Sequence, residues 1–359
     1  MNVALAGLPL SGKTCLFTAL SEGVVDSATN PARADHPNAA MIAMPDERLG
    51  WLAEHYHVRK RVAVQMEFLD LPGLAPGRPD LAAQNTAIME HLRRADALVC
   101  VLRAFESSRV PGKVDPRADG ASLRAEFLLS DLDTTLRRIE KLQKQITKPS
   151  ADRDLMKKEL EFLERCREAL EAERPLHEIV HTDAERAILR GFAMLTQKPL
   201  VMVLNVGEAE AGKPAEAAAT YAGIGLPAVA LCASLEAEIA QLPPEERAPF
   251  MAELGLDRLH APDVIRSVHE ALGRITFYTV AAEKEAAARS LPRGAAAVEA
   301  AAEVHTDLAK GFIRAEVVNF EDLRRAGSVK QARADGHFRL EGRDYVVRDG
   351  DVLLIHFSR

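Results

Sequence analysis

Gly7-Leu8-Pro9-Leu10-Ser11-Gly12-Lys13-Thr14 is the stretch of sequence that decides the fold of this chain. It fits G-x-x-x-x-G-K-[ST], in which glycines let backbone N–H groups turn inward around phosphate groups. An apolar run precedes it at residues 3–6, and a helix-like run follows at 15–20. The pattern predicts a phosphate-binding loop between a strand and a helix. Lys13 is predicted to supply a catalytic positive charge, and Thr14 is predicted to ligate Mg²⁺. The predicted phosphate contacts are Leu10, Ser11, Gly12, Lys13, Thr14 and Cys15.

Composition excludes several classes of protein. The chain has 359 residues, enough for two or three domains, and a formal net charge of −7, which does not favour wholesale nucleic-acid binding. The four cysteines, which lack CxxC spacing, are Cys15, Cys100, Cys166 and Cys232. That spacing argues against a disulfide framework or a zinc site and suits a reducing cytosol. No apolar run reaches membrane-spanning length, and the N-terminus reads as a first strand. We therefore expect a cytoplasmic protein.

Apolar runs and helical periods alternate along much of the chain. Strands are predicted at residues 62–69, 97–102, 200–204 and 228–231, with a helix at 86–94. Continuous apolar runs such as 97–102 are typical of parallel strands buried on both faces. The alternation predicts a doubly wound α/β domain of the P-loop NTPase class, formed by residues 1–120 and 183–276.

The period changes between about residues 121 and 182. Apolar residues recur every three or four positions from Leu129 to Ile146, and again from Met156 to Leu170. A break at residues 147–150 separates the two runs, which predicts an antiparallel helical hairpin. One interpretation is a projecting arm that touches a large partner, and the other is an insertion that simply packs on the domain.

The pattern of apolar and turn residues changes again at residues 277–359. Short β-like runs at 315–320, 345–347 and 352–357 flank turn residues, and residues 295–302 favour a helix. This pattern predicts a small α+β domain with a mixed sheet. Its basic and acidic residues balance, so charge gives no strong RNA signal.

Asp70 and Gly73 form a second nucleotide-site pattern, D-x-x-G, at the end of a predicted strand. Such an aspartate orients a water on Mg²⁺, and the glycine N–H contacts the γ-phosphate. Leu74 follows, where many GTPases carry the glutamine that orients the attacking water. Leucine cannot do this, so hydrolysis is expected to be slow or assisted by another group.

Two further loops favour contacts with the base. Asn205, Val206 and Glu208 stand where GTPases carry NKxD, but without the lysine and with a longer acid. Adenine lacks the N1–H and N2–H₂ donors that guanine offers to such an acid, so selection for guanine should be weak. The alternative is that Asn205 and Glu208 only cap a helix. Ser234 and Leu235 follow the next strand, where backbone N–H groups commonly touch the base.

Together these motifs resemble those of the YchF/OBG-like ATPase family over nearly the whole chain. Residues 7–20 resemble GLPNVGKSTLFNAL, residues 44–49 resemble MPDPRL, and residues 66–74 resemble MEFVDIAGL. Residues 305–315 are similar to HTDFEKGFIRA, and residues 341–352 to EGKDYIVxDGDV. The NxxE motif at residues 205–208 is the family's own.

The resemblance implies a P-loop domain, an inserted helical arm at residues 121–182 and a C-terminal TGS-like β-grasp domain at 277–359. It implies Mg²⁺-dependent hydrolysis of ATP in preference to, or alongside, GTP. It also implies association with ribosomes through the large subunit, or with another ribonucleoprotein.

The sequence departs from the family in three places. Ala34 replaces the switch I threonine and cannot ligate a metal. The glycine-rich segment after Leu74 is shortened to residues 75–80. The family's histidine before VSGKV is missing, and Arg109 precedes residues 110–114 instead. Arg109 is either a group that stabilises phosphoryl charge or an ordinary surface residue.

Two functions from different classes follow from these motifs. The first is an ATPase switch in which ATP hydrolysis changes the orientation of the arm and the C-terminal domain against the partner. The second is a nucleotide-gated binding module with little or no turnover, since three switch features are lost. A monomer is the simpler expectation for the oligomeric state.

Overall fold

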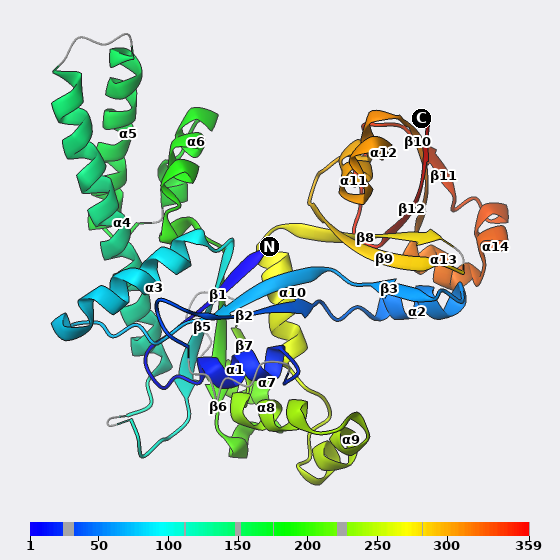
Figure 1. Cartoon of the computed structure of the whole chain (residues 1–359), viewed down its shortest axis with the longest axis horizontal. Coiled ribbons are helices and arrows are strands. Elements are labelled where there is room, and N and C mark those ends of the chain that lie inside the picture. Colours follow the sequence, from blue (N-terminus) through cyan, green and yellow to red (C-terminus); the bar gives the residue numbers. More distant parts are fainter. Residues whose placement is uncertain are drawn as a thin grey trace. The chain divides into compact units, whose positions relative to one another are not determined.

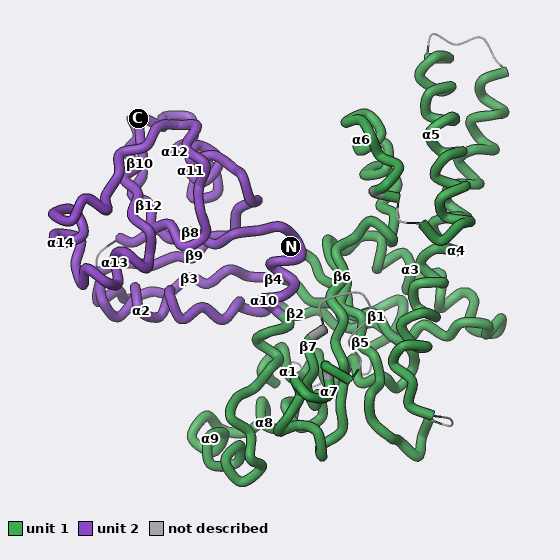
Figure 2. The backbone as a smooth tube through the Cα atoms, turned by 180° about the vertical axis from the view of Figure 1, so that it is seen from behind, with its two compact units in different colours: residues 1–40, 67–264 green, residues 41–66, 265–359 purple. Residues whose placement is uncertain are grey.

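The computed structural model describes residues 1–23, 32–110, 113–147, 152–174, 176–220, 228–281 and 283–358. The chain divides into two compact units (Figure 2). The first unit comprises Met1–Ala40 and Glu67–Val264, and the second comprises Met41–Met66 and Ile265–Arg359. The predicted loop after the first helix, the hairpin turn and the segment after Arg109 lie partly outside the described residues, at 24–31, 148–151 and 111–112.

The first unit is built on a six-stranded sheet with the strand order β2-β4-β1-β5-β6-β7 (Figure 1). Its strands are β1 (Asn2–Ala6), β2 (Asn38–Ala43), β4 (Gln65–Asp70), β5 (Ala97–Ala104), β6 (Leu200–Val206) and β7 (Ala228–Leu231). β1 pairs in parallel with β4 and β5, β5 with β6, and β6 with β7. The predicted doubly wound parallel sheet is therefore confirmed.

Helices connect these strands. They are α1 (Lys13–Leu20), α3 (Ala82–Arg94), α4 (Pro116–Ile146), α5 (Arg153–Glu171), α6 (Asp183–Phe192) and α7 (Pro214–Thr220), with 3₁₀ turns η1 (Pro79–Leu81), η2 (Leu176–Ile179), η3 (Leu195–Gln197) and η4 (Glu208–Glu210). After β7 come α8 (Ala233–Gln241), α9 (Pro244–Glu253) and α10 (Ala261–Ala271), and α10 begins in the first unit and ends in the second. α1 packs against α8, and α4 packs against β5. Because parallel strands place their carboxyl ends at one edge, the loops after β1, β4, β5, β6 and β7 gather there.

α4 and α5 form the predicted antiparallel hairpin and extend away from the sheet (Figure 1). Its buried seam differs from the expected one. Leu129 and Leu136 have exposed fractions of 60% and 39%, whereas Asp131 and Thr135 are fully buried. The rest of the predicted seam is buried or half-buried, with Ile139, Leu142 and Leu163 among its buried members, so the apolar period fails only where two polar side chains occupy the buried face of α4.

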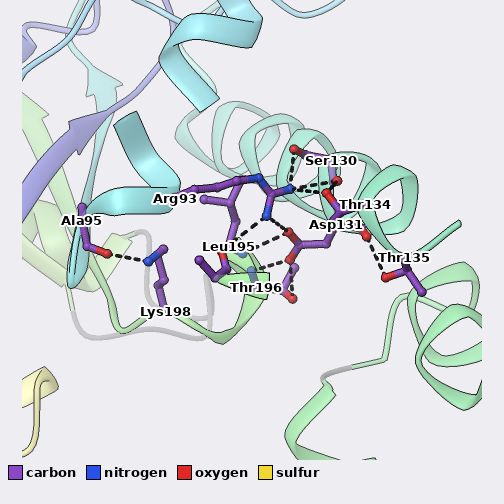
Figure 3. A network of polar contacts seen from close by, with 10 residues as sticks. Arg93, Ala95, Ser130, Asp131, Thr134, Thr135, Leu195, Thr196 and Lys198 are labelled. Atoms are coloured by element: carbon purple, nitrogen blue, oxygen red, sulfur yellow. Dashed lines mark hydrogen bonds and ion pairs between the residues drawn. The ribbon is translucent and has the colours of Figure 1, made fainter. Parts of the chain in front are cut away.

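Arg93 and Asp131 explain that burial (Figure 3). The Arg93 guanidinium lies 3.0 Å from the Asp131 carboxylate and also donates to the Ser130 hydroxyl over 2.8 Å. The Asp131 carboxylate accepts from Leu195 N over 3.0 Å and from Thr196 N over 2.8 Å. This network joins the end of α3 to the middle of α4 and to η3, which precedes β6.

The second unit contains a mixed sheet with the order β11-β10-β12-β8-β9-β3. Its elements are α2 (Glu47–His55), β3 (Lys60–Val62), β8 (Arg274–Ala281), β9 (Glu285–Pro292), α11 (Ala297–Val304), α12 (Thr306–Lys310), β10 (Phe312–Asn319), α13 (Phe320–Ala326), α14 (Val329–Ala334), β11 (Arg339–Glu341) and β12 (Asp351–Phe357). β8 pairs with β9 in the antiparallel sense, and β12 with β8 in the parallel sense. The predicted α+β fold with a mixed sheet is confirmed.

Three local expectations differ from the structure. The run at residues 62–69 is divided between β3 and β4, and Val346 makes only an isolated bridge with Ala296. Residues 41–66 and 265–276, placed in the first domain by the sequence pattern, belong to the second compact unit. The reason is that β3 pairs with β9 and the Tyr278 hydroxyl bonds Asp46. No helix within the described ranges is long and apolar enough to cross a membrane.

Candidate nucleotide-binding site

The loop between β1 and α1 has the backbone that the phosphate-loop pattern predicts. Gly12 has φ of 92°, and a Cβ there would lie 2.0 Å from Asn205 Nδ2. Glycine is therefore required both for its left-handed conformation and for the close approach of the asparagine. Ser11 N donates to Leu8 O over 3.3 Å, which closes the turn directly before α1 begins.

Lys13 is buried beneath this loop, with an exposed fraction of 5%. Its Nζ donates to Leu8 O over 2.9 Å and to Gly7 O over 3.3 Å. Burial lowers the pKa of the Lys13 ammonium from 10.5 to about 8, and the Asp70 carboxylate opposes that shift. Backbone carbonyls thus hold the ammonium at the position where the motif requires a positive charge.

Thr14 and Asp70, predicted as the metal ligands, are brought together. The Thr14 hydroxyl donates to Asp70 Oδ2 over 3.0 Å. Burial raises the pKa of the Asp70 carboxyl, while the Thr14 hydroxyl and the Lys13 charge oppose the rise. Asp70 Oδ1 is buried and has no hydrogen-bond partner in the part of the chain that is described. An orphaned carboxylate oxygen beside a hydroxyl fits a hydrated Mg²⁺, which prefers oxygen ligands and keeps several waters.

Gly73 lies against the phosphate loop. A Cβ at this position would be 2.4 Å from Pro9 N, so only glycine permits the contact. Leu74 N donates to Gly7 O over 3.0 Å, and the Leu74 side chain is 1% exposed within the hydrophobic core. The position of the usual water-orienting glutamine therefore faces the core.

Asn205 joins two loops of the site. Its Nδ2 donates to Ser11 O over 3.0 Å, and its Oδ1 accepts from Ala233 N over 2.9 Å. The exposed Glu208 and Ser234 lie beside the opening that Asn205 spans. Leu235 is 7% exposed and packs in the core, so only its backbone can reach the site.

These loops enclose a cavity of about 1010 Å³. Of the predicted site residues, those that line it are Leu10, Gly12, Lys13, Thr14, Cys15, Gly73, Arg109, Asn205, Val206, Glu208 and Ser234. Ser11, Asp70 and Leu235 are buried behind the wall. The exposed Arg109 is held by its backbone N–H, which donates to the Ser107 hydroxyl over 3.2 Å.

Sequence reasoning missed Phe105, Glu106 and Glu210, which also line the cavity. The available signal was their position directly after β5 and β6. Loops at the carboxyl ends of adjacent parallel strands meet at one edge, so every such loop is a candidate for the site.

On the switch I side, Ala34 O lies 3.1 Å from His91 Nε2, and Arg33 pairs with Asp35 over 3.0 Å. The Ala34 side chain carries no oxygen and so cannot ligate a metal, as the sequence implies.

Two family models match separate regions of the chain. A model described as 50S ribosome-binding GTPase matches residues 2–148. The YchF-GTPase_C model, described as a protein of unknown function, matches residues 274–358.

Full-length relatives are also similar. The Ribosome-binding ATPase YchF of Bacillus subtilis (strain 168) is 34% identical over 367 residues, covering 100% of this chain and 99% of the relative. Its namesake from Escherichia coli O157:H7 is 36% identical over 363 residues, with 99% and 98% covered. Obg-like ATPase 1 of Oryza sativa subsp. japonica is 31% identical over 367 residues, with 100% and 92% covered. The solved Schizosaccharomyces pombe YchF GTPase superposes with a TM-score of 0.82 at 25% identity, covering 99% of this chain and 97% of that one.

Proposed function

The chain belongs to the YchF family, and from that premise we propose that it is a nucleotide-dependent switch that binds ATP, hydrolyses it slowly and acts on the ribosome. The observation that carries the proposal is that Lys13 and Thr14 line one cavity of about 1010 Å³, with the Asp70 carboxylate hydrogen-bonded to Thr14 and close enough to act on the Lys13 charge. A cavity of this size accommodates a nucleoside triphosphate. The phosphates would sit on residues 10–15 and the γ-phosphate near the Gly73 N–H.

The metal fits the donor set. Thr14 Oγ1 would ligate Mg²⁺, and Asp70 would hold one of its waters. Bound there, the ion would neutralise charge on the β- and γ-phosphate oxygens.

ATP is proposed over GTP because of the loop after β6. Glu208 lines the cavity without the lysine that packs along guanine in NKxD proteins. Val206 and Ser234 line the cavity on the same side. Asn205 serves these contacts by holding the phosphate loop against the loop after β7.

Slow turnover follows from the groups around the γ-phosphate position. Leu74 is buried, and Ala34 replaces the switch I threonine. Arg109 lies on the cavity wall, from which it would stabilise phosphoryl charge, but an arginine orients water poorly. These same features favour the second candidate, a nucleotide-gated binding module with little or no hydrolysis.

The ribosome enters the proposal through the names of the relatives, which are ribosome-binding ATPases. We assign contact to the large subunit and propose that the protein acts as a cytoplasmic monomer. The hairpin of α4 and α5 would serve as the arm that touches this partner. The same proposal includes a nucleotide-binding domain, an inserted arm at residues 121–182 and a C-terminal domain, with residues 41–66 and 265–276 in the second compact unit.

One paired experiment tests the proposal. Calorimetric titration with ATP and GTP analogues measures base preference, and phosphate release with and without ribosomes measures turnover. We expect tighter ATP binding, slow release and loss of both in Lys13→Ala. Tight GTP binding without ATP binding would overturn the base assignment. Tight ATP binding with no turnover in either condition would establish the binding module instead.

A further inference from the structure

A second cavity, of about 670 Å³, lies entirely within the second compact unit. It brings together Asp46 and Arg48 from the segment before and within α2, and Asp349 from the turn before β12. Both segments belong to motifs that the nucleotide site leaves without a role. Apart from Met44, Pro45 and Thr276, every lining residue is ionisable, so the cavity suits a charged ligand. The ionisable residues are Asp46, Glu47, Arg48, Arg266, His269, Glu270, Arg274, Arg293 and Asp349.

Two of the carboxylates are already fully hydrogen-bonded. Asp46 Oδ1 accepts from Arg48 N over 2.9 Å, and its Oδ2 accepts from the Tyr278 hydroxyl over 2.6 Å. Asp349 Oδ1 accepts from Thr276 N over 2.8 Å, and its Oδ2 accepts from Arg48 Nη1 over 2.7 Å. These acids therefore fix the wall of the cavity, with each of their oxygens already accepting at least one hydrogen bond.

Three further arginines reach the cavity from different elements: Arg266 from α10, Arg274 from β8 and Arg293 from the chain after β9. Arg274 is held in place because its Nε donates to the Ser290 hydroxyl over 2.6 Å. Glu47 and Glu270, which oppose these arginines, are exposed, and so is Arg293, whereas Arg266 and Arg274 are half-buried and less screened by water. Guanidinium groups match the oxygens of phosphates and carboxylates bidentately, and several of them around one cavity can neutralise the multiple charges of a phosphate.

His269 forms part of the cavity wall and is 5% exposed. Its Nε2 lies 3.0 Å from the Ser290 hydroxyl, the same group that Arg274 contacts. Burial, then Arg274, lowers the pKa of His269 below its usual 6.5. The groups facing it are Arg274, Arg48, Asp46 and Asp349. Protonation of the imidazole would add one positive charge to the arginine cluster.

We propose that this cavity binds a small phosphate-bearing ligand, up to the size of a mononucleotide. Its volume of about 670 Å³ lies within the usual range of small-molecule sites. The inference goes beyond the proposed ATPase, since no residue of this cavity belongs to the unit that carries Lys13. An experiment that disproves one of the two sites therefore does not disprove the other.

The test uses the full chain carrying Lys13→Ala, which is expected to abolish nucleotide binding at the phosphate loop. Calorimetry with inorganic pyrophosphate and with AMP measures binding to the second cavity. We expect saturable binding that weakens about tenfold or more when Arg266→Gln and Arg293→Gln are added together. The matched control is Arg324→Gln, an exposed arginine of α13 outside the cavity, and it should leave the affinity unchanged.

A circular dichroism spectrum and a melting curve for each variant separate lost binding from lost folding. Below about pH 6.5, where His269 begins to take up a proton, the unmodified cavity should bind each probe more tightly than the His269→Gln variant at the same pH, and at pH 8, where the imidazole is neutral, the two should bind alike. Absence of saturable binding to either probe would overturn the proposal, as would equal affinity in the cavity variant and the Arg324→Gln control. Binding of a short single-stranded RNA without binding of pyrophosphate or AMP would also overturn it.

Discussion

The Arg93 guanidinium and the Asp131 carboxylate meet 3.0 Å apart at the base of the helical hairpin (Figure 3). Arg93 closes α3, the helix that follows the Gly73 segment, and Asp131 lies in α4. The contact therefore links the helix that follows the Gly73 segment to the arm. It is buried, since the Asp131 side chain is fully inaccessible.

Asp131→Asn should lower the free energy of unfolding by about 3 kcal/mol, since it removes one charge of a buried pair and turns an amide toward backbone donors. Urea unfolding followed by circular dichroism measures the change. Asp133→Asn is the control two residues away. It breaks only an exposed pair with Arg137 and should cost less than about 1 kcal/mol. Equal losses in the two variants would contradict the structural role of Asp131.

ATP affinity should fall about tenfold between pH 7 and pH 9, because phosphate requires the protonated Lys13 and the pKa of that ammonium is lowered to about 8. Above the pKa, binding must first take up a proton. Calorimetry in buffers of different ionisation enthalpy measures both the affinity and the proton uptake. Lys13→Arg, which stays charged, should bind with little dependence on pH. A flat profile for the unmodified chain would refute this expectation.

Gly73→Ala should weaken ATP binding at least about tenfold and cost about 1–3 kcal/mol of unfolding free energy. The added methyl would lie 2.4 Å from Pro9 N, so the backbone of the phosphate loop must move. Gly191→Ala is the control in the same unit. It lies in α6 with no atom within 4 Å of the added Cβ, and should stabilise by up to about 1 kcal/mol.

Asp70→Asn should raise the Mg²⁺ concentration needed for half-maximal ATP binding about tenfold, because a neutral amide holds metal-bound water less well. Thr14→Ala should act in the same direction by removing the proposed ligand, whereas Thr14→Ser keeps a hydroxyl and should retain affinity. A Mg²⁺ titration of fluorescent ATP-analogue binding measures all three. An unchanged requirement in Asp70→Asn and Thr14→Ala would exclude these residues from the metal site.

Acid should destabilise the second unit partly through His269. Its pKa is lowered in the folded chain, so below about pH 6.5 the unfolded chain binds the proton more readily, and the unfolding free energy decreases. Above that pH both states are neutral, and the contribution vanishes. Trp51, the single tryptophan, lies in α2 and reports unfolding of this unit. Between pH 7.5 and 5.5, His269→Gln should lose less stability than the unmodified chain.

The sequence was sufficient for the phosphate loop, the parallel strands and the hairpin, because each depends on local spacing. Lys13, Thr14 and Asp70 come together because strand order places the ends of β1 and β4 side by side. The sequence predicted a doubly wound sheet with these loops at one edge, whereas the strand order itself comes from the structure.

Long-range pairing explains what the sequence did not reveal. The apolar period gave no sign that Asp131 is buried, because its burial depends on Arg93 and on two backbone N–H groups about 65 positions away. The place of residues 41–66 depends on the pairing of β3 with β9, more than 220 positions later in the chain. Periodicity carries no information about partners so far away.

Asn205 has a consequence for the kinetics of nucleotide exchange. Its amide hydrogen-bonds both the phosphate loop and the loop after β7, so these two loops are already held together before a nucleotide binds. Association then orders little additional chain, and the entropy lost on binding is small. Arrival of ATP and of GTP should consequently be similarly fast, and discrimination between them should lie in how long each nucleotide stays.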